Sequence, residues 1–250
     1  MRGLKNKRVV ITGGASGIGA ATAARFLEEG SRVAVIDRDE PASQAIREQL
    51  PNLGGTFLAD VSDLAQVQNA LGKVVVALGG LDVVINNAGI SIRHNFLDIT
   101  PEEWKKVLAV NLTGVFHVAQ TAARYMMEHD GGVILNTAST NGIMGYPFYA
   151  DYNASKAGVI ELTRSMALEL APKVRVSAVA PGYVLTPMQR AEYTDEMLAA
   201  VNQKLPLGRH AVPEEVAALF AFLASDDAAY LNGHVYVIDG GETAGGLASR

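Results

Sequence analysis

Three side chains of this 250-residue sequence could together move a proton: Ser139, Tyr152 and Lys156. Tyr152 and Lys156 are four residues apart in a stretch that is predicted to be helical, so their side chains leave one helix face. A nearby ammonium group favours the ionised form of a phenol and lowers its pKa from about 10. Such a tyrosine can donate a proton to a developing alkoxide or take one from an alcohol. From this spacing alone, the alternative interpretation is that both side chains are exposed on the helix surface and have no catalytic role.

The position of Ser139 favours the catalytic interpretation. Ser139 ends the run Gly132–Ser139, which is predicted to be a strand, 13 residues before Tyr152. Ligands of open α/β sheets bind at the carboxyl ends of the strands. We therefore expect Ser139 to lie beside the tyrosine and the lysine at one edge of a sheet.

A glycine-rich turn, T-G-G-A-S-G-I-G at Thr12–Gly19, follows the first predicted strand and opens the first predicted helix. Glycines let the backbone turn tightly and let a pyrophosphate approach the free N–H groups at a helix start. The spacing G-x-x-x-G-x-G differs from the common G-x-G-x-x-G, and no Gly-Lys-Ser/Thr follows that would indicate a P-loop. An ordinary tight turn is the alternative, but the place between strand and helix favours dinucleotide binding.

Asp37 is predicted to end the second strand, 18 residues after Gly19. A carboxylate at about this offset reaches the adenosine ribose hydroxyls and repels a 2′-phosphate, which favours NAD over NADP. Arg38 weakens the argument because a guanidinium could hold that phosphate, whereas no basic residue stands beside Gly17. A solvated strand end is the alternative for Asp37.

Predicted strands and predicted helices alternate along the whole chain and could position these residues. Continuously apolar strands such as Val33–Ile36 are typical of a parallel sheet with helices on both faces. We predict an α/β fold, a Rossmann-type doubly wound parallel sheet of about seven strands, in one domain over residues 1–250. After the fourth strand, one long helical stretch is predicted, with Thr100 as its N-cap and Glu103 at the third position in a capping-box arrangement. The segment 182–212 is predicted to be irregular, with one or two short helices, and to form a substrate lid. The predicted strands are Arg8–Thr12, Arg32–Asp37, Gly55–Ala59, Asp82–Asn86, Gly132–Ser139, Val174–Ala180 and Gly233–Ile238.

With these motifs in order along the chain, the sequence resembles the single-domain short-chain dehydrogenase/reductase family. The motifs that carry the resemblance are Thr12–Gly19, Asp60-Val61, N-N-A-G at Asn86–Gly89, Asn111, Ser139, Y-N-A-S-K at Tyr152–Lys156, Pro181-Gly182, Thr186 and Asp239-Gly240-Gly241. The resemblance implies that Tyr152 is the general acid/base and that Ser139 polarises the substrate oxygen. It also implies that Lys156 binds the nicotinamide ribose and that Asn111 completes a water-linked proton relay.

The resemblance further implies a set of cofactor contacts, with Asp60 and Val61 near the adenine, Asn87 on the adenosine ribose side and 181–186 around the nicotinamide. The full set is Gly13, Ser16, Gly17, Ile18, Gly19, Asp37, Asp60, Val61, Asn87, Ala88, Gly89, Tyr152, Lys156, Pro181, Gly182, Val184 and Thr186. The predicted activity is hydride transfer between NAD(H) and a secondary alcohol or ketone. An NADPH-dependent 3-oxoacyl thioester reductase and a non-catalytic dinucleotide sensor are the alternatives.

Composition excludes several other classes. The net charge of −5 argues against nucleic acid or an anionic membrane as the main partner. The sequence has no cysteine, which excludes disulfides and thiolate catalysis, and its five histidines show no metal-binding spacing. The longest apolar run, Val216–Ala224, is too short to span a bilayer, and no signal peptide is recognisable at the start. We therefore expect a cytoplasmic enzyme with no metal ion.

Two expectations concern the surface. Arg93 and His94 follow N-N-A-G, so Arg93 either recognises an anionic or polyhydroxylated substrate or is a rim residue that faces water. Apolar faces on the helices that carry Asn111 and Tyr152, together with the resemblance, imply a homotetramer. The sequence does not identify the alcohol or ketone.

Overall fold

A single sheet of seven parallel strands forms the centre of the protein, in the order β3-β2-β1-β4-β5-β6-β7. This computed structural model describes residues 1–245. The predicted doubly wound parallel sheet is confirmed, and each predicted strand agrees with the observed one to within two residues at either end. The strands are β1 Arg8–Thr12, β2 Arg32–Asp37, β3 Gly55–Leu58, β4 Val83–Asn86, β5 Gly132–Thr137, β6 Val174–Pro181 and β7 Val235–Ile238.

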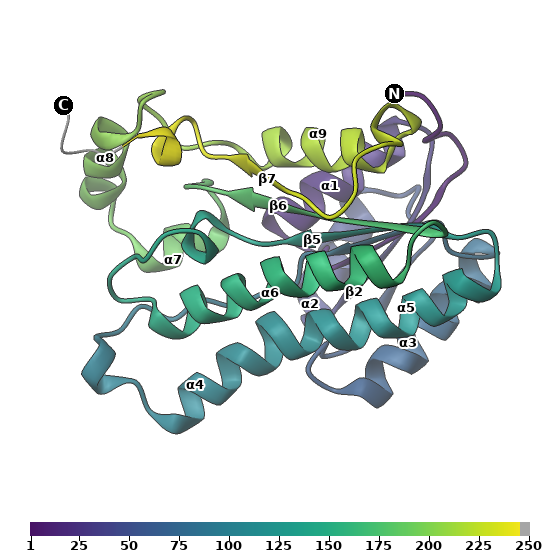
Figure 1. Cartoon of the computed structure of the whole chain (residues 1–250), viewed down its shortest axis with the longest axis horizontal. Coiled ribbons are helices and arrows are strands. Elements are labelled where there is room, and N and C mark those ends of the chain that lie inside the picture. The colour runs from purple at the N-terminus through teal and green to yellow at the C-terminus, as the bar shows by residue number, and fades with distance from the viewer. Residues whose placement is uncertain (246–250) are drawn as a thin grey trace.

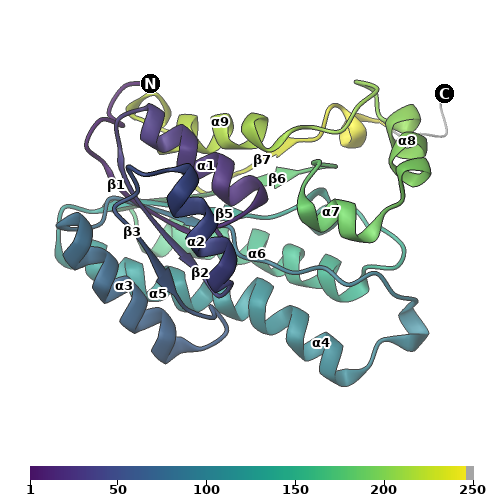
Figure 2. The same cartoon turned by 180° about the vertical axis from the view of Figure 1, so that it is seen from behind.

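Helices cover both faces of the sheet (Figure 1). Helices α3, α5 and α6 pack on one face, and α1 and α9 pack on the other, where α2 also lies in the reverse view (Figure 2). Because both faces are covered, the central strands contain continuous apolar runs, and residues 33–36 of β2 are at most 1% exposed. The helices are α1 Gly17–Glu28, α2 Glu40–Gln49, α3 Leu64–Leu78, α4 Pro101–Leu108, α5 Gly114–Glu128, α6 Ala150–Glu169, α7 Pro187–Glu192, α8 Asp195–Lys204 and α9 Pro213–Ala224.

The stretch that the sequence presents as one long helix is interrupted. Thr100 and Glu103 form the predicted capping box at the start of α4, with the Thr100 side chain accepting from the Glu103 N–H. Between α4 and α5, however, residues Ala109–Thr113 form a turn of π-helix. Single π turns inside α-helices often occur at functional sites, and this one carries Asn111.

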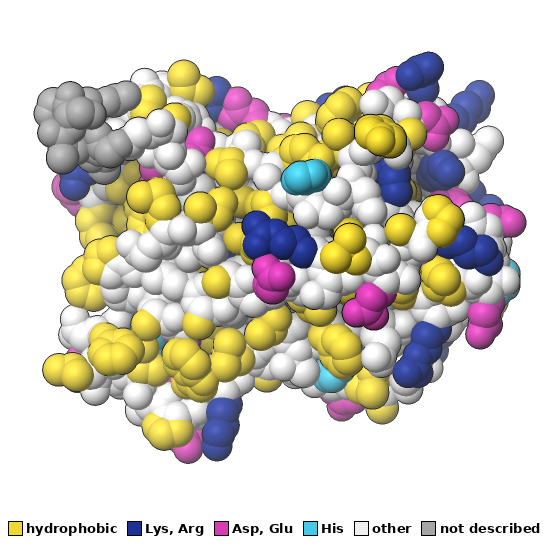
Figure 3. Space-filling model, viewed as in Figure 1, with side chains coloured by type: hydrophobic (Ala, Val, Ile, Leu, Met, Phe, Trp, Pro, Cys, Tyr) yellow, Lys and Arg dark blue, Asp and Glu magenta, His cyan; other side chains and the backbone are white. Residues whose placement is uncertain are grey.

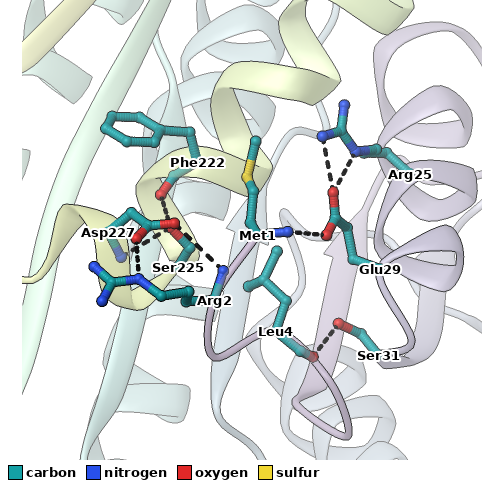
Figure 4. Close-up of polar contacts among 9 residues, drawn as sticks. All are labelled: Met1, Arg2, Leu4, Arg25, Glu29, Ser31, Phe222, Ser225 and Asp227. Atoms are coloured by element: carbon teal, nitrogen blue, oxygen red, sulfur yellow. Dashed lines mark hydrogen bonds and ion pairs between the residues drawn. The ribbon is translucent and has the colours of Figure 1, made fainter.

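At the amino ends of the strands, the start of the chain is held by ion pairs (Figure 4). The N-terminal ammonium group of Met1 and the guanidinium of Arg25 both contact Glu29. Arg2 pairs with Asp227 after α9. These contacts fix the segment before β1 against the ends of α1 and α9.

The carboxyl ends of the strands face the segment 182–212, which contains α7 and α8 (Figures 1 and 2). The two short helices agree with the prediction for this segment. Within residues 1–245, no helix combines the length and the apolar character that crossing a bilayer requires.

Candidate active site

Two adjoining cavities lie at the carboxyl edge of the sheet. The larger, which we call the cleft, has a volume of about 240 Å³ and is lined by the glycine-rich turn, the ends of β2 and β4, and part of α6. The smaller, which we call the pocket, has a volume of about 90 Å³ and is lined by Ser139, several tyrosines and part of α7. Tyr152 and Met188 line both cavities, so Tyr152 stands at their junction.

The glycine-rich turn lies at the start of α1 and forms one wall of the cleft. Gly13 has a φ of +60° and Gly17 a φ of +51°, values that favour glycine. A Cβ on Gly13 would lie 2.7 Å from the Cα of Ala88, too close for any side chain. Ser16 precedes α1, and within residues 1–245 its side chain accepts no capping hydrogen bond, so the N–H groups of the first helical turn could bind a phosphate.

Gly19 has a structural role within this turn. A Cβ on Gly19 would lie 2.1 Å from the Gly13 carbonyl oxygen, so glycine allows α1 to pack closely on the turn. Gly19 is absent from the part of the cleft wall that residues 1–245 form, whereas Gly13, Ser16, Gly17 and Ile18 line it.

At the end of β2, Asp37 lines the cleft and its carboxylate accepts hydrogen bonds from the N–H groups of Ala15 and Asp39, both at 3.1 Å. The guanidinium of Arg38 lies 3.5 Å from the Asp60 carboxylate and forms an ion pair with it. Burial opposes ionisation of Asp60, but hydrogen bonds from Ser62 and the charge of Arg38 outweigh it and lower the pKa of Asp60. The arginine that follows Asp37 is therefore already paired with a carboxylate.

The N-N-A-G motif after β4 forms the floor of the cleft. The Asn87 side chain donates to the Gly13 carbonyl oxygen over 3.0 Å, and its backbone N–H donates to the Thr12 hydroxyl over 3.1 Å. These bonds join the end of β4 to the glycine-rich turn. A Cβ on Gly89 would lie 3.7 Å from the Lys156 Nζ, so a side chain there would fill the floor in front of the lysine.

Lys156 and Tyr152 project from α6 toward the same end of the cleft, as their spacing predicts. Lys156 is 3% exposed, and its Nζ donates to the Thr137 carbonyl oxygen over 2.7 Å. The same Nζ lies 5.6 Å from the centre of the Tyr152 ring. Burial lowers the pKa of Lys156 to about 8, because an ammonium ion is poorly solvated inside the protein.

The pKa of Tyr152 differs from the expectation. Burial raises it to about 12, the Ser139 side chain lowers it, and the negative charge of Glu192 raises it further. The predicted lowering by Lys156 is thus wrong for this structure, because desolvation of the phenolate dominates. Tyr152 is consequently protonated at neutral pH and is available as a proton donor.

Ser139 is the N-cap residue of the short 3-10 turn Thr140–Gly142 that follows β5, and 7% of its surface is exposed. Its hydroxyl accepts from the N–H of Asn141 over 3.2 Å and contacts the Asn141 side-chain oxygen at 3.3 Å. Ser139 and Tyr152 both line the pocket. A carbonyl oxygen in the pocket could therefore meet two hydroxyl groups.

Asn111 is fully buried in the π turn between α4 and α5. Its side chain accepts from the Ile90 N–H over 2.8 Å and donates to the Ile90 carbonyl oxygen over 2.9 Å. It also donates to the Ser155 hydroxyl over 3.2 Å. Asn111 therefore links Ile90, the residue after N-N-A-G, to Ser155 of α6, which precedes Lys156 in the chain.

Part of the predicted cofactor set lies away from the cleft. Gly182 lines the pocket instead. Pro181 is buried at the end of β6, and Val184 is 5% exposed and packs into the core cluster beneath α1 and α9. Of residues 181–186, Thr186 lines the cleft.

Several cleft residues were missing from the predicted set. They belong to strand ends, the loops after them, the π turn and the start of α7, and their position near a motif was the available signal: Ile36, Arg38, Ala59, Ile90, Val110, Thr137, Pro187 and Met188. The Thr137 hydroxyl is buried and has no hydrogen-bond partner among the described residues. Since buried polar groups are nearly always hydrogen-bonded, this hydroxyl could bind a polar ligand in the cleft.

Arg93 lies at the exposed rim, and its guanidinium stacks over the Phe148 ring at 4.2 Å. In the part of the chain that the structure describes, neither cavity is lined by Arg93. His94 is buried and contacts the Asp151 carboxylate at 3.1 Å. These contacts agree with the rim interpretation of Arg93 and attach the loop after β4 to the start of α6.

Comparison with known proteins shows similarity over nearly the whole chain. A family model described as Enoyl-(Acyl carrier protein) reductase matches residues 13–243. The chain is 41% identical over 242 residues to the 3-oxoacyl-[acyl-carrier-protein] reductase FabG of Thermotoga maritima, which covers 95% of this chain and 98% of that protein. It is also 41% identical over 245 residues to a 3alpha-hydroxysteroid dehydrogenase of Mediterraneibacter gnavus, covering 95% of this chain and 97% of the relative.

Solved structures agree with these relatives. The structure of gox2181 superposes with a TM-score of 0.92 at 36% identity and covers 96% of this chain and 97% of its own. A 3-ketoacyl-(acyl-carrier-protein) reductase from Brucella melitensis complexed with NADH gives a TM-score of 0.91 at 32% identity, covering 96% and 99%. The resemblance carried by the sequence motifs is confirmed, and the chain belongs to the short-chain dehydrogenase/reductase family, whose members bind a nicotinamide dinucleotide.

Proposed function

We propose that this protein is an oxidoreductase that interconverts a secondary alcohol and a ketone, using NAD(H) as the hydride carrier. The observation that carries the proposal is the position of Tyr152, which lines both the cleft and the pocket. A proton donor at this junction can serve a substrate in the pocket while a dinucleotide is bound in the cleft.

The residues of the cleft fit a nicotinamide dinucleotide. The glycine-rich turn offers free N–H groups to a pyrophosphate, and Asp37 at one end is placed for ribose hydroxyls. At the other end, Lys156 and the unpaired Thr137 hydroxyl offer hydrogen-bond donors. Bound there, the nicotinamide would supply or accept the hydride.

The chain's own residues handle the proton. In the reducing direction, Tyr152 donates its phenolic proton to the substrate oxygen, and Ser139 holds the same oxygen by a hydrogen bond. Lys156 donates hydrogen bonds to the cofactor ribose. Asn111 fixes the backbone at Ile90 and, as the family resemblance implies, takes part in returning a proton to the tyrosine through water.

We infer a preference for NAD over NADP from the charges at the end of β2. Asp37 presents a carboxylate to the cleft, and an added 2′-phosphate would be repelled by it. The neighbouring guanidinium of Arg38 is paired with Asp60, so its charge is already compensated.

Quaternary structure and compartment are part of the proposal. Apolar side chains gather over the face formed by α4, α5 and α6 (Figure 3), where Trp104, Phe116 and Leu168 are exposed. Exposed apolar surface of this kind supports a homotetramer. The cytoplasm is the compartment that we propose, because the reaction needs a pool of nicotinamide dinucleotide. Light scattering coupled to size-exclusion chromatography tests the first statement and cell fractionation the second.

A 3-oxoacyl thioester reductase is the second candidate, favoured by the 41% identity to the Thermotoga maritima relative. Such an enzyme would reduce 3-oxoacyl thioesters with NADPH. The carboxylates of Asp37 beside the cleft and Glu192 beside the pocket count against it.

A panel of ketones, secondary alcohols and a 3-oxoacyl thioester, each assayed at 340 nm with NAD(H) and NADP(H), tests the proposal. The proposed activity predicts turnover of simple ketones and alcohols, with kcat/KM for NADH above that for NADPH. NADPH-dependent turnover of the thioester alone would establish the second candidate. Tight NADH binding without turnover of any compound would indicate a dinucleotide sensor.

A further inference from the structure

The pocket beside Tyr152 is lined in part by polar side chains of helix α7. Helix α7 contributes Gln189 and Glu192, which are three residues apart and therefore lie on one helix face. Tyr149 donates to Glu192 over 2.8 Å and so holds one carboxylate oxygen in place. The carboxylate of Glu192 and the amide group of Gln189 thus line the same pocket as Ser139 and Tyr152.

Two polar atoms of this pair have no hydrogen-bond partner among residues 1–245. They are the Nε2 of Gln189, a donor, and the Oε1 of Glu192, an acceptor, and both atoms are buried. Buried polar groups are nearly always hydrogen-bonded, so an unpaired donor and acceptor on one helix face call for a ligand. No motif marked these two residues in the sequence.

The chemistry of the pair selects a hydroxyl group. An alcohol can accept a hydrogen bond from Gln189 and donate one to Glu192, which satisfies both atoms at once. A carboxylate or phosphate on the substrate would be repelled by Glu192. An ammonium group would satisfy Glu192 but has no acceptor to offer to Gln189.

We propose that Gln189 and Glu192 select a neutral substrate that carries a second hydroxyl group near its reacting carbon, as in a diol, a polyol or a hydroxyketone. This inference rests on the proposed function, because it assigns the substrate class of the same site. The pocket volume of about 90 Å³ suits a small molecule of this kind.

The tyrosines support this assignment. Tyr146 donates to Glu242 over 2.6 Å, and Tyr149 lies 3.3 Å from the Tyr193 hydroxyl while donating to Glu192. Their hydroxyl protons are used within the protein, whereas their oxygens keep lone pairs that can accept further bonds. These walls therefore favour a substrate rich in hydroxyl donors.

Three small ketones test the proposal: 3-hydroxy-2-butanone, 3-methoxy-2-butanone and 2-butanone. The methoxy compound keeps the electron-withdrawing oxygen but cannot donate a hydrogen bond to Glu192. For the wild-type enzyme with NADH, we expect kcat/KM for the hydroxyketone to exceed that for the other two by about 100-fold, since a site built to bind a hydroxyl rejects analogues without it.

Two variants separate the contacts. Glu192→Met should bring the hydroxy and methoxy ketones to within about threefold of each other, because the acceptor is lost. Gln189→Met should lower kcat/KM for both oxygen-bearing ketones by a common factor relative to 2-butanone. Arg190→Gln, on the same short helix but exposed, is the matched control and should leave all three ratios unchanged.

Different results would overturn different statements. Equal kcat/KM for the three ketones, or a Glu192→Met variant that keeps the full preference, overturns the inference and leaves the proposed function intact. Preference for aminoacetone or acetoacetate over the hydroxyketone also overturns it. Turnover of larger ketones alone, such as a steroid ketone, likewise overturns the inference. No turnover of any ketone, alcohol or thioester tested overturns the proposed function itself.

Discussion

The amino and carboxyl edges of the sheet differ in whether their polar groups have partners within the described residues. At the amino edge, charged side chains are paired with one another, as in the ion pairs of Arg8 with Asp82 and of Arg2 with Asp227. At the carboxyl edge, buried polar atoms of Thr137, Gln189 and Glu192 have no partner within residues 1–245.

This difference indicates that the amino edge contributes to the stability of the fold and the carboxyl edge to ligand binding. A paired charge at the amino edge is satisfied within the chain and contributes to folding, whereas an unpaired buried atom costs folding energy until a ligand satisfies it. Substitutions at the amino edge should therefore change the free energy of unfolding and leave catalysis alone. Substitutions at the carboxyl edge should do the reverse.

The largest effect is expected at the junction of the two cavities. Tyr152→Phe removes the proton donor and should lower kcat by at least about 1,000-fold, within the range of general acid–base catalysis. Because the phenyl ring is retained, the NADH dissociation constant and the melting temperature should stay close to wild type. Absorbance at 340 nm measures kcat, NADH fluorescence measures the dissociation constant, and thermal unfolding followed by circular dichroism measures the melting temperature.

Tyr230→Phe is the matched control, since Tyr230 is fully exposed and far from either cavity wall within the described residues. It should behave as wild type. Retention of a tenth or more of the wild-type kcat by Tyr152→Phe would assign proton transfer to another group.

The opposite outcome is expected from Asp82→Asn at the amino edge. Asp82 receives three hydrogen bonds from Arg8, including those from the backbone N–H at 2.7 Å and from Nε at 2.8 Å. Loss of the charge should lower the free energy of unfolding by about 1–3 kcal/mol and leave kcat/KM unchanged. Urea unfolding and steady-state assays measure these quantities.

Glu161→Gln is the control for this variant, because the exposed pair of Glu161 with Arg164 should contribute under about 1 kcal/mol. Burial opposes ionisation of Asp82, but the hydrogen bonds from Arg8 dominate and lower its pKa. The stabilisation should accordingly be present above about pH 4 and be lost as the pH falls through the native pKa. A folded Asp82→Asn enzyme with tenfold lower kcat/KM would break the separation of the two edges.

The pH dependence of alcohol oxidation and of ketone reduction tests the role of Tyr152 as the proton donor and acceptor. Because the pKa of Tyr152 is raised to about 12, alcohol oxidation, which needs the phenolate, should rise about tenfold per pH unit between pH 6 and 8. Ketone reduction, which needs the phenol, should not rise over this range. The negative charge of Glu192 contributes to the raised pKa, so Glu192→Gln should move the oxidation profile to lower pH. Superimposable profiles for the two enzymes would contradict this electrostatic coupling.

The smallest change is expected in cofactor choice. Asp37→Asn removes the charge that opposes a 2′-phosphate and should lower the ratio of kcat/KM for NADH to that for NADPH by about tenfold. Asp39→Asn, two residues further along the chain and outside the described cleft wall, is the control. If the Asp37→Asn variant keeps the wild-type ratio of kcat/KM for NADH to that for NADPH, Asp37 does not determine cofactor selection.

The sequence predicts the framework well because its signals are local. Strand β1 was predicted with its observed bounds, since an apolar run followed by a glycine turn leaves little choice. The shared direction of Tyr152 and Lys156 follows from helix geometry alone. The capping box of Thr100 and Glu103 depends on residues only three positions apart.

What the sequence does not predict depends on distant packing. The π turn that carries Asn111 interrupts a pattern that reads as one helix, and the Asn111 side chain binds the backbone at Ile90, 21 positions away. The raised pKa of Tyr152 reflects burial, which spacing along a helix does not report. The place of Val184 in the core depends on how the segment after β6 folds back.

A crystal structure with NADH bound tests the central claim most directly. The account predicts density for the dinucleotide along the cleft, with its pyrophosphate at the glycine-rich turn and its nicotinamide at the end where Tyr152 and Lys156 lie. Density in the reverse orientation, or NADH bound at another surface, would contradict the assignment of the carboxyl edge as the active site.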